Sequence, residues 1–223
     1  MRAVASHPAR PFDAGRIIQL AHAANPAKWS GAMESDYARA MNDFLLLLRQ
    51  RNIPFVVVGG IALLQHVPGR NTEDLDLILA APHLLEIPEL ELTERNDMFA
   101  KGNFHGLRVD LLFYEHPFFG KITREYATEL SYTVGQLRTA TVEGLILLKL
   151  FALPSLYRQF DLDRAAIYEA DLVQLVSRTE HEDSFFLNVL CEYLPGSDQR
   201  ELTSILKEIR QKIARLRGSA PAS

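Results

Sequence analysis

The chain of 223 residues contains a single cysteine, Cys191. One cysteine excludes an intramolecular disulfide bond and a cysteine-based zinc site. Its apolar setting, "FFLNVLCEYL", predicts a buried small hydrophobic residue and not a nucleophile. No apolar run approaches the roughly 20 residues of a membrane span, and no apolar segment near the N-terminus is typical of a signal peptide. We therefore expect a protein that does not cross a membrane and that works in the reducing cytoplasm.

Other functional signatures are missing as well. The stretch "VGGIAL" lacks the third glycine of a dinucleotide-binding fingerprint, and no order of serine, histidine and aspartate favours a hydrolase triad. The spacing of His66, His105 and His116 is not typical of a metal site, so we interpret them as surface or turn residues. The net charge of −4 offers no general attraction to nucleic acid, although the basic "LKEIRQKIARLR" forms a local patch.

Hydrophobic periodicity divides the chain into a tail or arm over 1–31, an α/β part over 32–140 and a helical part over 141–223. The elements expected in the α/β part are a helix over 32–51, strands over 53–60 and 75–80 around a short helix over 60–67, and a hairpin over 97–114 with its turn at Gly102-Asn103. The helical part should begin with a helix that Thr141 opens and that ends before Pro154, followed by three more helices. The predicted fold class is α/β (α+β), a mixed sheet flanked by helices and followed by a C-terminal helical bundle.

Three acidic residues suggest chemistry in the α/β part. Asp74 and Asp76 begin the strand "LDLIL" and, being two residues apart, point to the same face of it. Asp110 lies in the apolar run "LRVDLLF", where a carboxylate is costly unless it is paired or bound to a metal. Such oxygen ligands suit magnesium that carries a nucleotide's phosphates. An Asp-x-Asp pair alone is common in surface turns, so the prediction of a metal site depends on its surroundings.

The surroundings are a glycine pair and two polar residues. Gly59 and Gly60 end a strand and open a helix, so that bare backbone N–H groups could approach a triphosphate. Arg70 and Thr72 add a cation and a hydroxyl donor before the acidic pair. A Gly-Gly after a strand is usually only a turn, but the order of these features favours a clamp for a nucleotide over a solvated turn.

The residues "VVGGIALLQHVPGRNTEDLDLIL" and "LRVDLLF" resemble the nucleotidyltransferase fold of the DNA polymerase beta superfamily. The likeness is greatest to its minimal bacterial branch, which includes the nucleotidyltransferase toxins of abortive-infection and type IV toxin–antitoxin systems. It covers roughly residues 53–177 and is specific in the first half. The resemblance implies transfer of a nucleoside monophosphate from ATP or another nucleoside triphosphate to an acceptor hydroxyl. It implies magnesium, or manganese in its place, on Asp74, Asp76 and Asp110.

The same family carries a lysine and then an aspartate on two successive helices, which match Lys149 in "EGLILLKLFAL" and Asp171 in "DRAAIYEADLVQLV". From the residues alone, Lys149 either extends its amine to water or binds a partner, because its helix is strongly apolar. Asp171 lies on the apolar stripe of its helix, so we expect it to pair with Lys149 or Arg158. The resemblance implies that Lys149 holds a phosphate of the nucleotide and that Asp171 belongs to the same site.

The resemblance leaves the acceptor open. RNA such as a tRNA end, a protein hydroxyl and a small molecule such as an antibiotic are all compatible with it, and a toxin would have a cognate antitoxin as partner. An alternative interpretation is a catalytically inactive protein of the same fold that binds a nucleotide or a partner chain. All three expected acids are present, which favours the enzyme.

Overall fold

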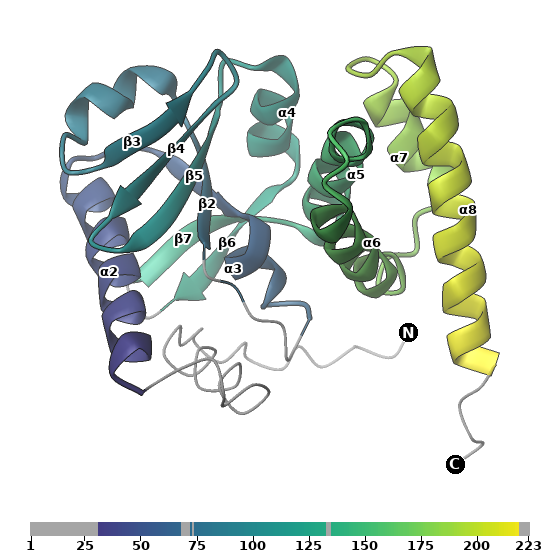
Figure 1. Cartoon of the computed structure of the whole chain (residues 1–223), viewed down its shortest axis with the longest axis horizontal. Coiled ribbons are helices and arrows are strands. Elements are labelled where there is room, and N and C mark those ends of the chain that lie inside the picture. The colour runs from purple at the N-terminus through teal and green to yellow at the C-terminus, as the bar shows by residue number, and fades with distance from the viewer. Residues whose placement is uncertain (1–30, 68–71, 73, 133–134, 219–223) are drawn as a thin grey trace, which may run out of the picture. The chain divides into compact units, whose positions relative to one another are not determined.

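A computed structural model describes residues 31–67, 72, 74–132 and 135–218 of the chain, with side chains from residue 36 except that of Tyr132 (Figure 1). Arg70 and residues 1–30 of the tail predicted over 1–31 lie outside the described residues, whereas Gly31 begins a helix. The chain forms two compact units, of which the first ends at Thr139 and the second begins at Ala140. In the described part, no helix is both long and apolar enough to cross a bilayer.

The first unit is built on a seven-stranded mixed sheet with the strand order β3-β4-β5-β2-β1-β7-β6. The central strand β2 runs antiparallel to β1 and parallel to β5, and β1 runs parallel to β7. The mixed sheet and its helices confirm the predicted fold class. The strands are β1 (Phe55–Val58), β2 (Asp74–Leu79), β3 (Glu91–Arg95), β4 (Phe99–Phe104), β5 (Leu107–Phe113), β6 (Ala127–Tyr132) and β7 (Gly135–Ala140).

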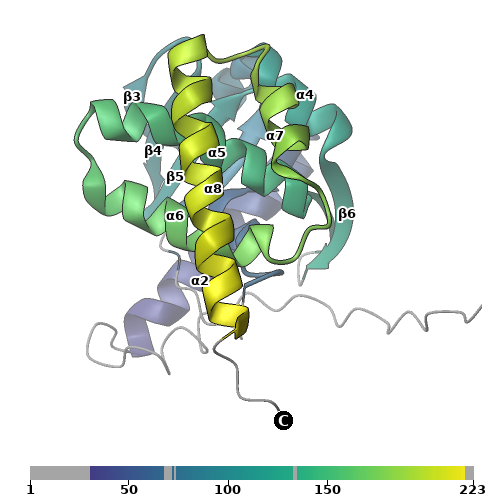
Figure 2. The ribbon, with the colours of Figure 1, turned by 90° about the vertical axis from the view of Figure 1, so that its right-hand side faces the viewer.

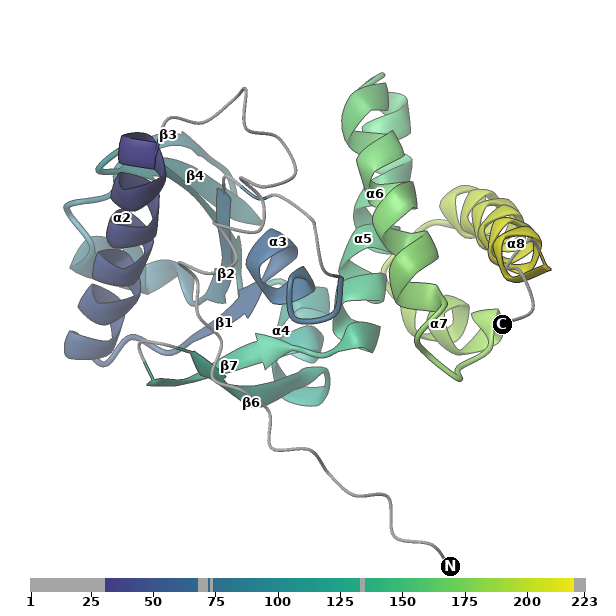
Figure 3. The same cartoon turned by 90° about the horizontal axis from the view of Figure 1, so that it is seen from below.

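Helices lie on both sides of this sheet. They are α2 (Gly31–Gln50), α3 (Gly59–Leu63) and α4 (Pro117–Glu125), with the short 3-10 helix η1 (Ala81–Glu86) after β2. Figure 3 shows α2 on one side of the sheet and α3 on the other. The predicted helix and strands from residue 32 to residue 80 are confirmed, although α3 is shorter than expected.

The two faces of the sheet differ because side chains alternate along each strand. On the face covered by α2, the fully buried Phe44 meets Phe104 of β4 with ring centroids 4.9 Å apart. Leu75, Leu77 and their register partners on β5 are also buried on that face. Asp74 and Asp76 point to the opposite face, where they are half-buried. The alternation therefore separates an apolar core from a polar surface along the same strand.

The hairpin β4–β5 forms, but its turn differs from the prediction. Gly102 and Asn103 lie inside β4, and the turn consists of His105 and Gly106, because Phe104 pairs with Leu107. Both turn residues have positive φ angles, 51° and 87°, as a tight two-residue hairpin turn requires. Gly102 is needed within the strand, since a Cβ there would lie 2.8 Å from the backbone oxygen of Glu91.

The described part of the second unit, up to residue 218, consists of four helices that pack on one another (Figure 2): α5 (Val142–Arg158), α6 (Leu162–Val176), α7 (Asp183–Leu190) and α8 (Gly196–Gly218). As predicted, Thr141 caps α5, and its hydroxyl accepts a hydrogen bond from Gly144 N at 3.2 Å. The predicted end before Pro154 is wrong, because α5 continues through the proline. Leu153 and Leu156 on either side of it are buried, so packing outweighs the hydrogen bond that a proline removes.

Cys191 corrects another prediction. It is exposed at the C-terminal cap of α7, whereas Phe186 and Leu190 bury the apolar side of that short helix. The buried Phe186 and Leu190 point to another side of the helix, so they do not cover the thiol. The Cys191 Sγ lies 2.9 Å from the backbone oxygen of Asn188, in the local arrangement of a helix end.

Candidate active site

The structure brings Asp76 and Asp110 together on adjacent strands. They are direct register partners across the parallel pair β2–β5, so their side chains lie on the same face of the sheet. Neighbouring strands lie about 4.8 Å apart, which places the two carboxylates within reach of one small ion. Asp74 lies on the same face two residues earlier along β2, beside Arg108 of β5. The expectation that Asp110 belongs to the neighbouring strand is confirmed.

The glycine pair lies directly against the acidic pair. Gly60 N donates a hydrogen bond to Asp76 Oδ2 at 3.2 Å. A Cβ atom on Gly59 would lie 1.9 Å from the same oxygen, and Gly59 has a φ angle of +58°. A Cβ atom on Gly60 would lie 2.1 Å from Thr72 Oγ1. Both glycines are therefore required by the close approach of the side chains that the sequence singled out, and not only by the reversal of the chain.

Thr72 has a defined position between these groups. Its half-buried hydroxyl donates to the backbone oxygen of Asp74 at 3.2 Å and so fixes the approach to β2. The hydroxyl of Thr72 and the backbone N–H of Gly60 thus support the strand and the carboxylate of Asp76. A direct contact of Thr72, Gly59, Gly60 or Arg70 with a triphosphate stays a prediction.

Arg108 is a member of the site that sequence reasoning missed. Its Nη2 lies 2.5 Å from Asp74 Oδ1, and its side chain is 61% exposed. Arg108 precedes Asp110 by two residues on one strand, and this spacing would have placed both on the same face. The site therefore contains a cation next to the carboxylates, and Asp74 is engaged by it.

The acids form no preassembled metal cage. Among the described residues, no three histidine, cysteine or acidic side chains are close enough together to hold a metal ion. Magnesium is usually held by one or two carboxylates together with the phosphates of its substrate. The adjacent pair Asp76 and Asp110 matches that smaller requirement and offers only oxygen donors. The residues therefore fit a metal that arrives with a nucleotide, and a full set of three protein ligands would require Asp74 to leave Arg108.

Lys149 and Asp171 form a buried ion pair within the second unit. Lys149 Nζ lies 2.8 Å from Asp171 Oδ2, and the two side chains are only 7% and 4% exposed. The same nitrogen lies 4.1 Å from the centroid of the Tyr168 ring. The predicted pairing of Asp171 with Lys149 is confirmed, while Arg158 binds Asp198 with two contacts of 2.9 Å. An amine extended to water is excluded by this burial, and the phosphate contact of Lys149 stays a prediction.

The N-terminus of α6 is capped by an aspartate. Asp161 caps the helix, and its carboxylate accepts a hydrogen bond from Arg164 N at 3.2 Å. Asp161 therefore has a structural role as the N-terminal cap of α6. The cap sets the first turn of the helix that carries Tyr168 and Asp171.

No protein-family model and no curated protein sequence matches the chain. Among solved structures, the chain is similar to an antigenic nucleotidyltransferase-like protein from Paracoccidioides brasiliensis, with 13% identity and a TM-score of 0.46 over 89% of this chain and 95% of that one. It is also similar to the antibiotic-resistance factor ANT(2'')-Ia in solution, with 12% identity and a TM-score of 0.43 over 83% and 100% of the two chains. A crystal structure of ANT(2'')-Ia in complex with adenylyl-2''-tobramycin gives 14% identity and a TM-score of 0.41 over 77% and 95%.

Of these three structures, the first is named a nucleotidyltransferase-like protein. At this level of likeness they assign no activity to the chain. What the chain can do chemically rests on the carboxylates, the glycine turn and the cation that its own residues bring together.

Proposed function

We propose that the first unit is a magnesium-dependent nucleotidyltransferase domain, which transfers a nucleoside monophosphate from a nucleoside triphosphate to an acceptor hydroxyl. The observation that carries this proposal is the register of β2 and β5, which pairs Asp76 with Asp110 beside a glycine turn that contacts Asp76 directly. A solvated turn explains neither the hydrogen bond from Gly60 N nor the exclusion of every side chain at Gly59. Both features hold one carboxylate in one orientation, which is what a metal ligand needs.

In the proposed reaction, the acceptor oxygen attacks the α-phosphorus, the bond to the β-phosphate oxygen breaks and pyrophosphate leaves. Magnesium, or manganese in its place, supplies positive charge that stabilises the phosphates as the bond breaks. Asp76 would hold this metal together with Asp74, which would first have to leave Arg108. Asp110 orients the acceptor hydroxyl and receives its proton, because it flanks Asp76 on the neighbouring strand. Arg108 places a cation beside this reaction, since it contacts Asp74.

The phosphate contacts of the proposal involve Gly59, Gly60, Arg70 and Thr72 in the first unit. Lys149 is included because of the family resemblance. Its ion pair with Asp171 balances the charge of the lysine until a phosphate of the nucleotide competes with Asp171 for the ammonium group. The alternative for Lys149 is a structural role in the second unit, which the contact with Tyr168 favours.

The acceptor is an RNA, a protein or a small molecule. A toxin acting on tRNA, with a cognate antitoxin, belongs to the first class, and the basic residues near the end of α8 favour it slightly. An antibiotic hydroxyl belongs to the third class. Incubation of the full chain with magnesium and each labelled nucleoside triphosphate, together with total tRNA, a protein extract or a panel of antibiotics, separates the three.

The decisive test compares Asp110→Asn with Asp97→Asn, an exposed aspartate just before β4 that serves as the matched control. Asp110→Asn should bind magnesium–nucleotide within about tenfold of wild type, or about 1.4 kcal/mol, because Asp74 and Asp76 remain. Pyrophosphate release should fall by several orders of magnitude, whereas Asp97→Asn should leave both measurements unchanged. An Asp110→Asn variant as active as wild type removes Asp110 from the reaction. A wild-type chain that binds nucleotide but transfers to no acceptor supports the inactive binding protein instead.

A further inference from the structure

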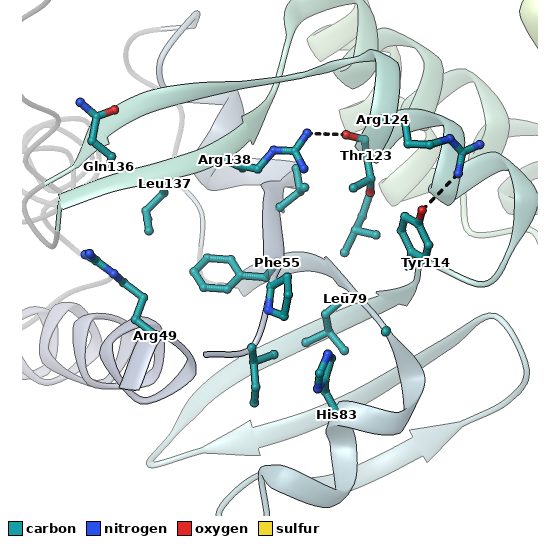
Figure 4. Close-up of a pocket in the computed structure, with 15 residues that line it drawn as sticks. Arg49, Phe55, Leu79, His83, Tyr114, Thr123, Arg124, Gln136, Leu137 and Arg138 are labelled. Atoms are coloured by element: carbon teal, nitrogen blue, oxygen red, sulfur yellow. Dashed lines mark hydrogen bonds between the residues drawn. The ribbon is translucent and has the colours of Figure 1, made fainter. Parts of the chain in front are cut away.

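The cavity shown in Figure 4 lies at the end of β1–β2 that is remote from the acids. It has a volume of about 510 Å³, and Phe55 and Leu79, which line it, are register partners at that end. Asp76 pairs with Val58 at the other end, roughly 10 Å along the strands at about 3.3 Å per residue. Side chains that can act on the acids therefore lie on the neighbouring strands of the sheet and not in this cavity.

The face of the sheet that carries the acids continues beyond β5 onto β4 and the edge strand β3. Register partners on adjacent strands point to the same face of a sheet. Lys101 of β4 is the register partner of Asp110 on β5 and also of Glu94 on β3. One lysine therefore lies between two acidic residues, each one strand spacing of about 4.8 Å away. Either carboxylate is close enough to bind its ammonium group.

Lys101 binds the acid at the edge of the sheet. Its Nζ lies 2.7 Å from Glu94 Oε2 and 5.1 Å from the centroid of the Phe99 ring. Phe99 precedes Lys101 by two residues on β4 and so points to the same face. Because β3 and β5 lie on opposite sides of β4, the ion pair with Glu94 draws the ammonium group away from Asp110.

Arg108 provides a comparison within the same sheet. Its register partners are Asp74 of β2 and Asn103 of β4. The amide of Asn103 carries no charge, and its Oδ1 accepts a hydrogen bond from Gly106 N at 2.8 Å. Of these two partners only Asp74 has a carboxylate, and Arg108 binds it. A cation with one acidic register partner thus occupies an acid of the candidate site, whereas a cation with two binds the acid outside it.

We infer that Glu94 is a positioning residue of the candidate active site, which binds Lys101 and thereby keeps its ammonium group from Asp110. The inference rests on the proposed function, in which the carboxylate of Asp110 serves a metal ion or the acceptor hydroxyl. Without Glu94, Asp110 is the one acid left among the register partners of Lys101. The lysine then competes with a metal for Asp110, as Arg108 competes for Asp74. The exposed strand β3 therefore acts on the site through one ion pair.

The test is a double-mutant cycle on Glu94 and Lys101, with the affinity of the full chain for manganese measured by calorimetry without nucleotide. Glu94→Gln should weaken manganese binding by up to about fivefold, the range for a new ion pair between exposed groups. Lys101→Gln should leave the affinity close to that of wild type, because Glu94 already holds the lysine. The variant with both substitutions should bind manganese as tightly as Lys101→Gln alone.

Two controls separate this effect from the loss of a negative charge. Glu94 is two strand spacings, roughly 10 Å, from Asp110, and about 0.15 M salt largely screens charges more than about 8 Å apart. Glu91→Gln is the matched variant, because Glu91 is an exposed acid on the same strand whose register partner, Asn103, is uncharged. It removes the same charge without releasing a lysine, so it should leave the affinity unchanged.

The same titrations can overturn the inference. Equal weakening by Glu94→Gln with and without Lys101 would refute it, as would an unchanged affinity in Glu94→Gln or the same loss in Glu91→Gln. Recovery in the double variant excludes a merely structural role, since that variant also lacks the ion pair. Asp76→Asn tests the proposed function separately. Manganese binding that is absent in wild type, or that survives Asp76→Asn, would refute the metal site on which both proposals rest.

Discussion

Replacing Gly59 with alanine tests whether nucleotidyl transfer depends on the close contact between the glycine turn and Asp76. Gly59 has a φ of +58°, and an alanine in this left-handed conformation costs about 1–2 kcal/mol of folding stability. The added Cβ would also lie 1.9 Å from Asp76 Oδ2, where real Cβ contacts are essentially never closer than 3.0 Å. The carboxylate must therefore move by about 1 Å, and a displacement of that size in a catalytic group can cost about a hundredfold in rate.

Gly106→Ala is the matched control. Gly106 has a φ of +87° in the turn between β4 and β5, and a Cβ atom there would meet nothing within 4 Å. Both variants should lose stability in thermal or denaturant unfolding, because both place alanine at positive φ, and Gly59→Ala adds to this the cost of displacing the Asp76 side chain. Only Gly59→Ala should lose nucleotidyl transfer, measured as pyrophosphate release with an acceptor extract. If the two variants retained the same activity, the contact between Gly59 and Asp76 would have no catalytic meaning.

Three further predictions concern Lys149, Arg108 and His116. Lys149→Met should lower the free energy of unfolding by about 3–5 kcal/mol in denaturant, because it leaves Asp171 buried and unpaired. Adding Asp171→Leu should restore most of that loss, and a Lys149→Met variant as stable as wild type would refute the prediction. Arg108→Gln should increase the affinity for manganese by up to about fivefold, because it removes the cation that competes for Asp74 in an exposed pair worth at most about 1 kcal/mol. The affinity is measured by calorimetry without nucleotide, and weaker binding would show that Arg108 does not compete. Burial lowers the pKa of His116 below its usual 6.5, so the unfolded chain takes up a proton at a higher pH than the folded one. The free energy of unfolding should therefore fall as the pH drops below about 6.5. His116→Gln should make this dependence on pH less steep, and an unchanged dependence would assign it to other groups.

The elements that were predicted correctly are those in which the order of apolar and polar residues matches the burial of the side chains. In β2, leucine alternates with aspartate, and the strand buries one of its faces as that alternation indicates. The helix α2 likewise buries Met41, Phe44 and Leu48 at helical spacing. These elements pack on one face only, so the periodicity of their side chains reports their secondary structure directly.

Elements without such a pattern were missed. All five residues of β3 are exposed, so its sequence "ELTER" carries no alternation of apolar and polar residues. The strand exists because its backbone pairs with β4, a long-range effect that a local pattern does not contain. The hairpin turn was misplaced for a related reason. Gly102 looks like a turn residue locally, but it is required by the close approach of Glu91 from the neighbouring strand.

The candidate site was predictable to the extent that it depends on spacing along strands. The same-face position of Asp74 and Asp76 follows from their separation by two residues, and the same rule would have included Arg108 with Asp110. The pairing of Asp76 with Asp110 could not be predicted, because it depends on the register between β2 and β5. Likewise, the hydrogen bond from Gly60 N to Asp76 exists only once β1 and β2 lie side by side.

The position of β1 in the sheet also has a consequence for the order in which the chain folds. Its partner on one side is β7, and the pair is joined where Val57 meets Thr139, about eighty residues later. Closing so long a loop costs entropy that the hairpin β4–β5, with its two-residue turn, does not incur. During synthesis, one edge of β1 therefore stays without its partner strand until β7 has left the ribosome. Contacts of β4 with β5 should form early and those of β7 late, so substitutions in β7 should mainly accelerate unfolding and leave the folding rate unchanged.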